Sequence, residues 1–64
     1  MTGTDVALIR GLLGLTQTQL APLLGYRHGV RVSEIERTGV ADGGAVGLLL
    51  AAYRAGYRPD SWPK

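Results

Sequence analysis

The chain has 64 residues and no cysteine, so we expect one small domain whose stability comes from helix packing, from an oligomer, or from both. Its formal net charge is a modest +2, and its single histidine argues against structural zinc. No segment approaches the run of about 18 apolar residues that spans a membrane, the N-terminus lacks the pattern of a secretory signal, and the absence of cysteine fits a cytoplasmic protein.

The first predicted helix lies between a cap at Thr4 and a stop at Gly14. Asp5 is placed favourably against the helix dipole at its start. Apolar residues recur at helical spacing in two stripes, one formed by Val6, Ile9 and Leu13 and the other by Leu8 and Leu12. This pattern predicts an amphipathic helix.

The second predicted helix begins at Thr16, which forms a Ser/Thr-x-x-Glu/Gln capping box with Gln19. Gly25 is suited to the left-handed residue that follows a helix. The buried side consists of Leu20, Ala21 and Leu24. Pro22 lies about six residues into the helix, where it removes a hydrogen bond and favours a kink. We therefore expect a helix that is short, bent or loosely wound.

The third predicted helix runs from about Val30 to Arg37, with His28 or Gly29 near its cap and Thr38-Gly39 at its end. Val32 and Ile35 point inward. The basic residues around this helix fall within eleven positions and are opposed by Glu34 and Glu36: Arg27, His28, Arg31 and Arg37. A local basic cluster is typical of nucleic-acid binding, and a solvated charged face is the alternative.

The fourth helix is predicted from a cap at Asp42 to Ala55, with Gly56 as its stop. Three glycines near its start each cost roughly 1 kcal/mol of helix propensity relative to alanine and favour fraying: Gly43, Gly44 and Gly47. Residues 57–64 contain two prolines and are predicted to be extended. The sequence thus predicts an all-α fold: a compact four-helix domain with a central helix-turn-helix in residues 1–56 and a C-terminal tail in residues 57–64.

Two stretches of the central region carry a known pattern: Leu15-Thr16-Gln17-x-x-Leu20-Ala21-x-x-Leu24-Gly25 and Val32-Ser33-x-Ile35-Glu36-Arg37. Together they resemble the helix-turn-helix of the Cro/C1-type (XRE-like) repressors of phages and bacteria. The resemblance is close from Ile9 to about Gly39 and looser over the fourth helix. The connection between the two helices is about one residue longer than usual, which shifts the recognition helix by one position. A Pro-containing tail also stands where the family usually has a fifth helix.

The resemblance implies double-stranded DNA as the partner, with the front of the third helix in the major groove. Gln17, helped by Thr18, corresponds to the family's phosphate contact. Arg31 is the best candidate for bidentate bonding to guanine, whereas Glu34 accepts from cytosine, orients Arg31 or faces solvent. Further implied contacts are Arg27 and His28 to phosphate or base, and Arg37 to the DNA backbone. For each of them, an ordinary exposed polar residue remains the alternative.

Arg10 and Glu36 have a different expected role. Members of the family often pair an arginine of the first helix with a glutamate of the third, partly buried beneath the DNA-binding surface. Both residues stand at the matching places here. We therefore predict a structural ion pair between them and no DNA contact by either.

The apolar residues outside the predicted core exceed what one small domain can bury, and most proteins of this kind bind two-fold operators as dimers. We expect a homodimer formed through the fourth helix and the tail, with Leu48, Tyr57 and Trp62 at its interface. The alternative is that Tyr57 and Trp62 fold back over the helices as a lid.

The sequence therefore predicts a sequence-specific transcriptional regulator, a repressor or autorepressor of a palindromic operator, similar to small phage regulators and to the autorepressors that accompany anti-CRISPR genes. The alternatives are an antitoxin of a toxin–antitoxin pair and a helix-turn-helix module that binds another protein. An enzyme is not expected, because no cysteine is present and no positioned acid accompanies His28. Neither a cofactor, a metal nor a small-molecule ligand is expected.

Overall fold

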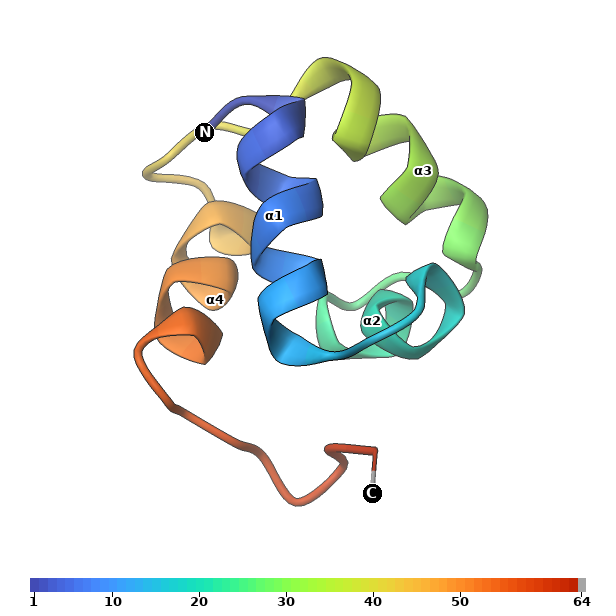
Figure 1. Ribbon diagram of the computed structural model, residues 1–64, viewed down its shortest axis with the longest axis vertical. Helices are drawn as coiled ribbons and strands as arrows, with labels where there is room; N and C mark the ends of the chain where they lie inside the picture. The colour runs from blue at the N-terminus through green and yellow to red at the C-terminus, as the bar shows by residue number, and fades with distance from the viewer. Residues whose placement is uncertain (64) are drawn as a thin grey trace.

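The structure, a computed structural model, describes residues 1–63 and contains four α-helices and, within that range, no strand. The helices are α1 (Gly3–Leu13), α2 (Gln17–Leu23), α3 (Gly29–Thr38) and α4 (Ala45–Arg54). Figure 1 shows α1 in the middle of the molecule with α3 and α4 on opposite sides of it. α3 packs against α1 and α2, and α4 packs against α1. The predicted all-α domain with a central helix-turn-helix is confirmed.

Helix α1 begins earlier than predicted, and its cap is Thr2 in place of Thr4. The hydroxyl of Thr2 accepts from the backbone N–H of Asp5 at 3.1 Å, and the carboxylate of Asp5 accepts from the N–H of Thr2 at 3.0 Å. A reciprocal capping box needs a polar side chain three residues after the cap. Asp5 stands three residues after Thr2 and supplies it, whereas the residue three after Thr4 is Ala7, which cannot. The predicted stop at Gly14 is confirmed by its φ of 72°.

Helix α2 has only seven residues, which confirms the expectation that Pro22 keeps it short. Its capping box is present as predicted, with bonds of 3.1 and 2.9 Å between Thr16 and Gln19. Gly25 adopts a φ of 83°, a conformation that residues with a Cβ rarely adopt. The buried side includes Leu23 in addition to the three residues predicted.

Helix α3 spans one residue more at each end than predicted and is capped by His28. Helix α4 starts at Ala45, so the predicted cap at Asp42 is wrong. The chain forms a turn at residues 41–44 and passes so close to α4 that a Cβ on Gly47 would lie 2.3 Å from the carbonyl oxygen of Ala41. Asp42 instead pairs with the amino group of Met1.

The core lies where all four helices meet, and its largest fully buried side chains are Leu20, Leu50, Val6 and Val32. Tyr53 links α4 to α2 at the border of the core, because its hydroxyl donates to the carbonyl oxygen of Leu23 at 2.5 Å. Within the described residues, no helix has both the length and the hydropathy required to cross a membrane.

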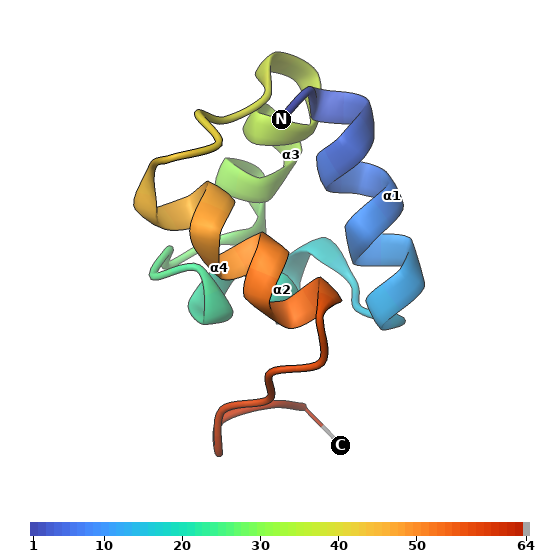
Figure 2. The ribbon, with the colours of Figure 1, turned by 90° about the vertical axis from the view of Figure 1, so that its left-hand side faces the viewer.

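The prediction of an extended tail is wrong for its final part. The chain leaves α4 and then turns, because the N–H of Trp62 donates to the carbonyl oxygen of Pro59 at 3.0 Å (Figure 2). Trp62 packs edge-on against Tyr53, with 5.2 Å between ring centroids, and Arg58 lies 4.3 Å above the Trp62 ring. The turn is centred on Asp60 and Ser61, and neither is followed by a proline, so the extended preference of residues before proline does not oppose it.

Candidate nucleic-acid interface

The beginnings of α2 and α3 lie against each other. A Cβ on Gly29, the first residue of α3, would stand 3.0 Å from both the backbone nitrogen and the hydroxyl of Thr18 on α2. These distances are tighter than ordinary van der Waals contact, so a residue with a Cβ at this position would push Thr18 away by a few tenths of an ångström. The contact brings the starts of the two helices together. We use the name α2–α3 edge for the predicted DNA-binding residues of these helices and their connection: Gln17, Thr18, Arg27, His28, Arg31, Glu34 and Arg37.

Arg10 and Glu36 form the predicted ion pair beneath this edge. The Nε and Nη2 groups of Arg10 donate to the two carboxylate oxygens of Glu36 at 2.5 and 3.3 Å. A third N–H of Arg10 donates to the carbonyl oxygen of Leu15 at 3.0 Å, so the guanidinium joins α1, α3 and the connection before α2. Its side chain is 25% exposed and that of Glu36 12%.

The electrostatics of the pair follow from this geometry. Hydrogen bonding to Arg10 lowers the pKa of Glu36 below its ordinary value, although burial of the carboxylate opposes the shift. The same bond raises the pKa of Arg10. Both groups are therefore held in their charged forms.

Gln17 takes part in this network. Its side-chain N–H donates to Glu36 at 3.1 Å, which fixes the amide at the start of α2 and leaves one of its two N–H groups for another acceptor. Gln17 is half-buried, unlike the plain exposed glutamine that was the alternative from sequence. Thr18, next along the helix, is exposed.

Arg31 at the front of α3 is held from two sides. Its guanidinium carbon lies 5.1 Å from the centre of the Tyr26 ring, and Nη1 lies 3.7 Å from the carboxylate of Glu34. This exposed ion pair is the contact that the orienting role of Glu34 requires, and the role in which Glu34 accepts from cytosine stays a prediction. Stacking on an aromatic face suits the planar guanidinium and restricts its rotamers.

Tyr26 was not among the predicted site residues. It lies in the connection between the helices, where no periodicity relates it to Arg31, so an aromatic residue five positions before an arginine is the only sequence signal. Its approach to Arg31 depends on how the connection folds.

The remaining basic residues of the edge are exposed. Arg27 lies in the connection, His28 caps α3 without a side-chain hydrogen bond, and Arg37 lies in the last turn of α3. In the part of the chain that the structure describes, neither Arg27 nor Arg37 forms an ion pair. Val30 is also exposed and stands one residue before Arg31. The edge thus presents positive charge, hydrogen-bond donors and the carboxylate of Glu34 to solvent, with the aliphatic Val30 beside them.

The residues predicted for dimerisation lie apart from this edge. Leu48 of α4 and Tyr57 of the tail are exposed, while Trp62 is half-buried against Tyr53 of its own chain. For Trp62 the structure shows the folded-back arrangement that was the alternative. Tyr57 stacks on Tyr53 with 6.1 Å between ring centroids but remains open on its other face.

Residues 1–63 hold no group of three acidic, histidine or cysteine side chains placed to bind a metal ion. Comparisons with known protein families, with curated proteins and with solved structures find no match.

Proposed function

We propose that this protein is a sequence-specific DNA-binding transcriptional regulator that acts in the cytoplasm as a repressor or autorepressor and binds a palindromic operator as a homodimer. The observation that supports this most is the placement of Arg31. It stands in the first turn of α3, where Tyr26 and Glu34 contact its guanidinium. The resemblance of this region to Cro/C1-type repressors supports the same function.

In this proposal, the start of α3 enters the major groove and Arg31 bonds to the O6 and N7 atoms of a guanine. A guanidinium that is already oriented loses less conformational freedom when it binds a base. Val30 contacts a thymine methyl group, and the carboxylate of Glu34 disfavours bases that present only acceptors to it.

The phosphate contacts come from the border of the same edge. The free N–H of Gln17 and the hydroxyl of Thr18 bond to one strand, and Arg27 and Arg37 neutralise phosphates on either side of the groove. Such contacts fix the register of the protein on the duplex and carry no sequence information. A dimer bound over a promoter excludes polymerase, which is the basis of the proposed repression.

Selection of bound sequences from a random pool of double-stranded DNA tests the proposal directly. We expect a palindrome whose half-sites share a guanine, and we expect its affinity to fall steeply between low and physiological salt. The Arg31→Ala variant should lose the preference at that guanine. A pool from which no palindrome is enriched contradicts the proposed function.

A protein-binding helix-turn-helix module is the second candidate, and the exposed Val30 beside the acidic Glu34 is the observation that favours it. The two candidates differ in their response to salt, because contacts with several phosphates release counterions. If the affinity for a partner changes little with salt and falls when Val30 is replaced, the partner is a protein.

A further inference from the structure

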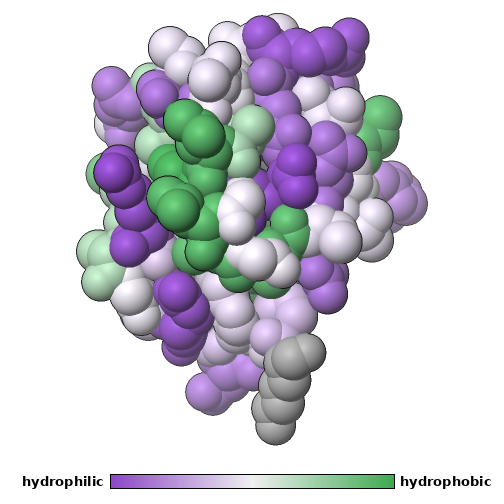
Figure 3. All heavy atoms as spheres, viewed as in Figure 1, coloured by the Kyte–Doolittle hydropathy of each residue, from purple (hydrophilic) through white to green (hydrophobic). Residues whose placement is uncertain are grey.

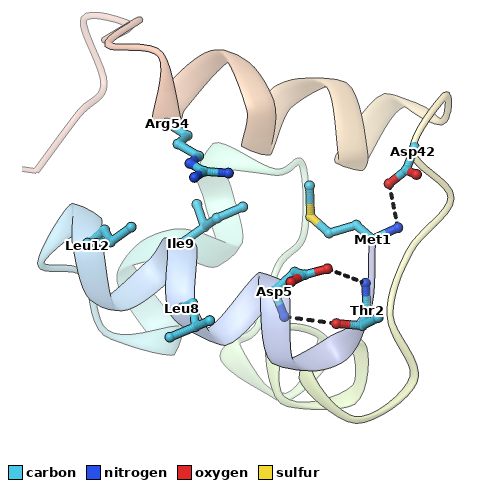
Figure 4. Close-up of a pocket in the computed structure, with 8 residues that line it drawn as sticks. All are labelled: Met1, Thr2, Asp5, Leu8, Ile9, Leu12, Asp42 and Arg54. Atoms are coloured by element: carbon cyan, nitrogen blue, oxygen red, sulfur yellow. Dashed lines mark hydrogen bonds and ion pairs between the residues drawn. The ribbon is translucent and has the colours of Figure 1, made fainter.

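A shallow hollow of about 630 Å³ lies along α1, between it and the end of α4. Figure 4 shows Leu8 and Leu12 on α1, Ile9 at the floor and Arg54 reaching over it from α4. Figure 3 shows the corresponding hydrophobic patch on this face of the molecule. The hollow is lined by α1 and by Arg54 of α4, and Figure 1 shows α3 on the opposite side of α1 from α4.

Two large apolar side chains of this face, Leu8 and Leu12, are not buried in the core. Leu8 is 61% exposed and Leu12 is 75% exposed, although they stand one helical turn apart on the same stripe. The core is complete without them, because Ile9 and Val6 fill the inward side of α1. Contiguous apolar surface on a small domain marks an interaction site more often than isolated exposed leucines do.

The positive and negative charges at the border of the hollow are equal in number. Asp5 borders it on α1 and Arg54 on α4, while the carboxylate of Asp42 is already paired with the amino group of Met1. Hydrogen bonds from Thr2 lower the pKa of Asp5, and the positive charge of Arg54 adds to that effect, so Asp5 is ionised. One acid and one base thus stand at different places on one apolar surface.

This arrangement suits a two-fold partner. In a two-fold interface the same patch of each copy faces the other. Two patches that carry one sign of charge repel each other. Two patches that each carry one acid and one base form two ion pairs, acid to base in both directions. The α2–α3 edge carries three arginines (Arg27, Arg31 and Arg37) and one acid, Glu34, which already pairs with Arg31, so its net positive charge repels a second copy. The hollow has no net charge, so it does not attract a partner that carries a large net charge of either sign. Its one acid and one base can instead pair with those of a second copy of this chain, which is the occupant that the charges favour.

We infer that the hollow binds a second copy of the chain across a two-fold axis, with Leu8 and Leu12 of the two copies in contact and Asp5 of each copy facing Arg54 of the other. This interface leaves both α2–α3 edges free, and the need for two copies on one operator rests on the proposed function. It differs from the interface predicted from sequence, which used Leu48, Tyr57 and Trp62.

Sedimentation equilibrium of the full chain at micromolar concentration tests the inference. We expect a dimer for the unaltered protein, and for Leu12→Glu a dissociation constant raised about tenfold or more, because a carboxylate is then buried without a partner. Leu48→Glu is the matched control, since Leu48 is 59% exposed on α4 but lies outside the hollow. It should dimerise as the unaltered protein does.

A second variant tests the charge pairing. Arg54→Glu brings two carboxylates together across the axis and should weaken the dimer by about fivefold or more. Circular dichroism should show the same helix content for all three variants, because each substituted side chain is exposed.

Three results overturn the inference: a monomer at all concentrations, dissociation by Leu48→Glu without dissociation by Leu12→Glu, or an Arg54→Glu dimer of unchanged affinity. Binding of the protein to a DNA fragment with a single half-site shows whether a failure concerns the interface or the proposed function. A monomer that binds the half-site contradicts the interface and the homodimer but leaves sequence-specific DNA binding intact. A dimer that dissociates with Leu12→Glu but binds no DNA contradicts only the function.

Discussion

The guanidinium of Arg10 on α1 and the carboxylate of Glu36 on α3 bond through two N–H groups, and the same carboxylate accepts from Gln17 on α2. One acidic side chain therefore connects the helix that scaffolds the domain with the two helices of the α2–α3 edge. The hydrogen bonds of the pair hold these three helices together, and under the proposed function they also orient Gln17 for its phosphate contact.

Removal of Arg10 should destabilise the domain strongly. Arg10→Ala leaves the largely buried Glu36 without its cation, at an expected cost of about 3 kcal/mol. For a domain of this size, that cost corresponds to a melting temperature lower by roughly 12–24 °C. Thermal unfolding followed by circular dichroism measures it. Arg37→Ala, which removes an exposed arginine, serves as the control, and equal melting temperatures for the two variants contradict the structural role.

The stability of the domain should fall at acidic pH through Glu36. Its pKa is lowered in the folded state, so its contribution is complete above about 4.5, the ordinary value, and is lost as the pH falls through the folded-state pKa. Glu36→Gln removes this dependence. We expect urea unfolding between pH 6 and about 3 to show a steeper loss for the unaltered protein than for the variant. Parallel curves would falsify the assignment.

Arg31 should govern sequence preference, in contrast to Arg37. Arg31→Ala is expected to cost about 1–3 kcal/mol on the selected operator and to relax the preference for one base in each half-site. Arg37→Ala should weaken binding to operator and unrelated DNA alike and reduce the slope of log affinity against log salt by about 1. Titrations of both DNAs at several salt concentrations distinguish the two.

Tyr26 should act on specificity through Arg31. Tyr26→Leu removes the aromatic face and should lower operator affinity about two- to fivefold, the value of an exposed cation–π contact. Tyr26→Phe retains the face and should bind as the unaltered protein does. Because Tyr26 is half-buried, melting temperatures are measured as well, and a loss that follows stability in both variants argues against a positioning role.

Two glycines of α1 should respond in opposite directions to alanine. A Cβ on Gly3 would lie 2.2 Å from the backbone oxygen of Glu36, so Gly3→Ala must displace α1 from α3 and should cost about 2 kcal/mol. Gly11 has nothing within 4 Å of the same position, so Gly11→Ala should stabilise the helix by up to about 1 kcal/mol. Chemical denaturation of both variants provides the comparison.

Local sequence signals predicted most of the helix ends. Gly14 and Gly25 end helices at positive φ, and the capping box at Thr16 is present as expected. At Thr4 two local signals competed, and Thr2 has the better reciprocal partner in Asp5. At Asp42 a tertiary contact replaces the local signal, because its carboxylate pairs with the amino group of Met1. Of the candidate site, the pairing of Arg10 with Glu36 came from the family resemblance and is confirmed as a contact.

By itself, the amino-acid sequence determined the four helices, the inward residues such as Leu20 and Val32, and the region in which positive charge gathers, because caps, glycine stops and apolar periodicity act over a few residues. Only the tertiary structure decided that Tyr26 stacks on Arg31, that Gln17 bonds to Glu36, and that Trp62 turns back onto Tyr53. Each of these contacts joins different elements or crosses a connection. Their geometry depends on how the helices pack, which no local pattern encodes.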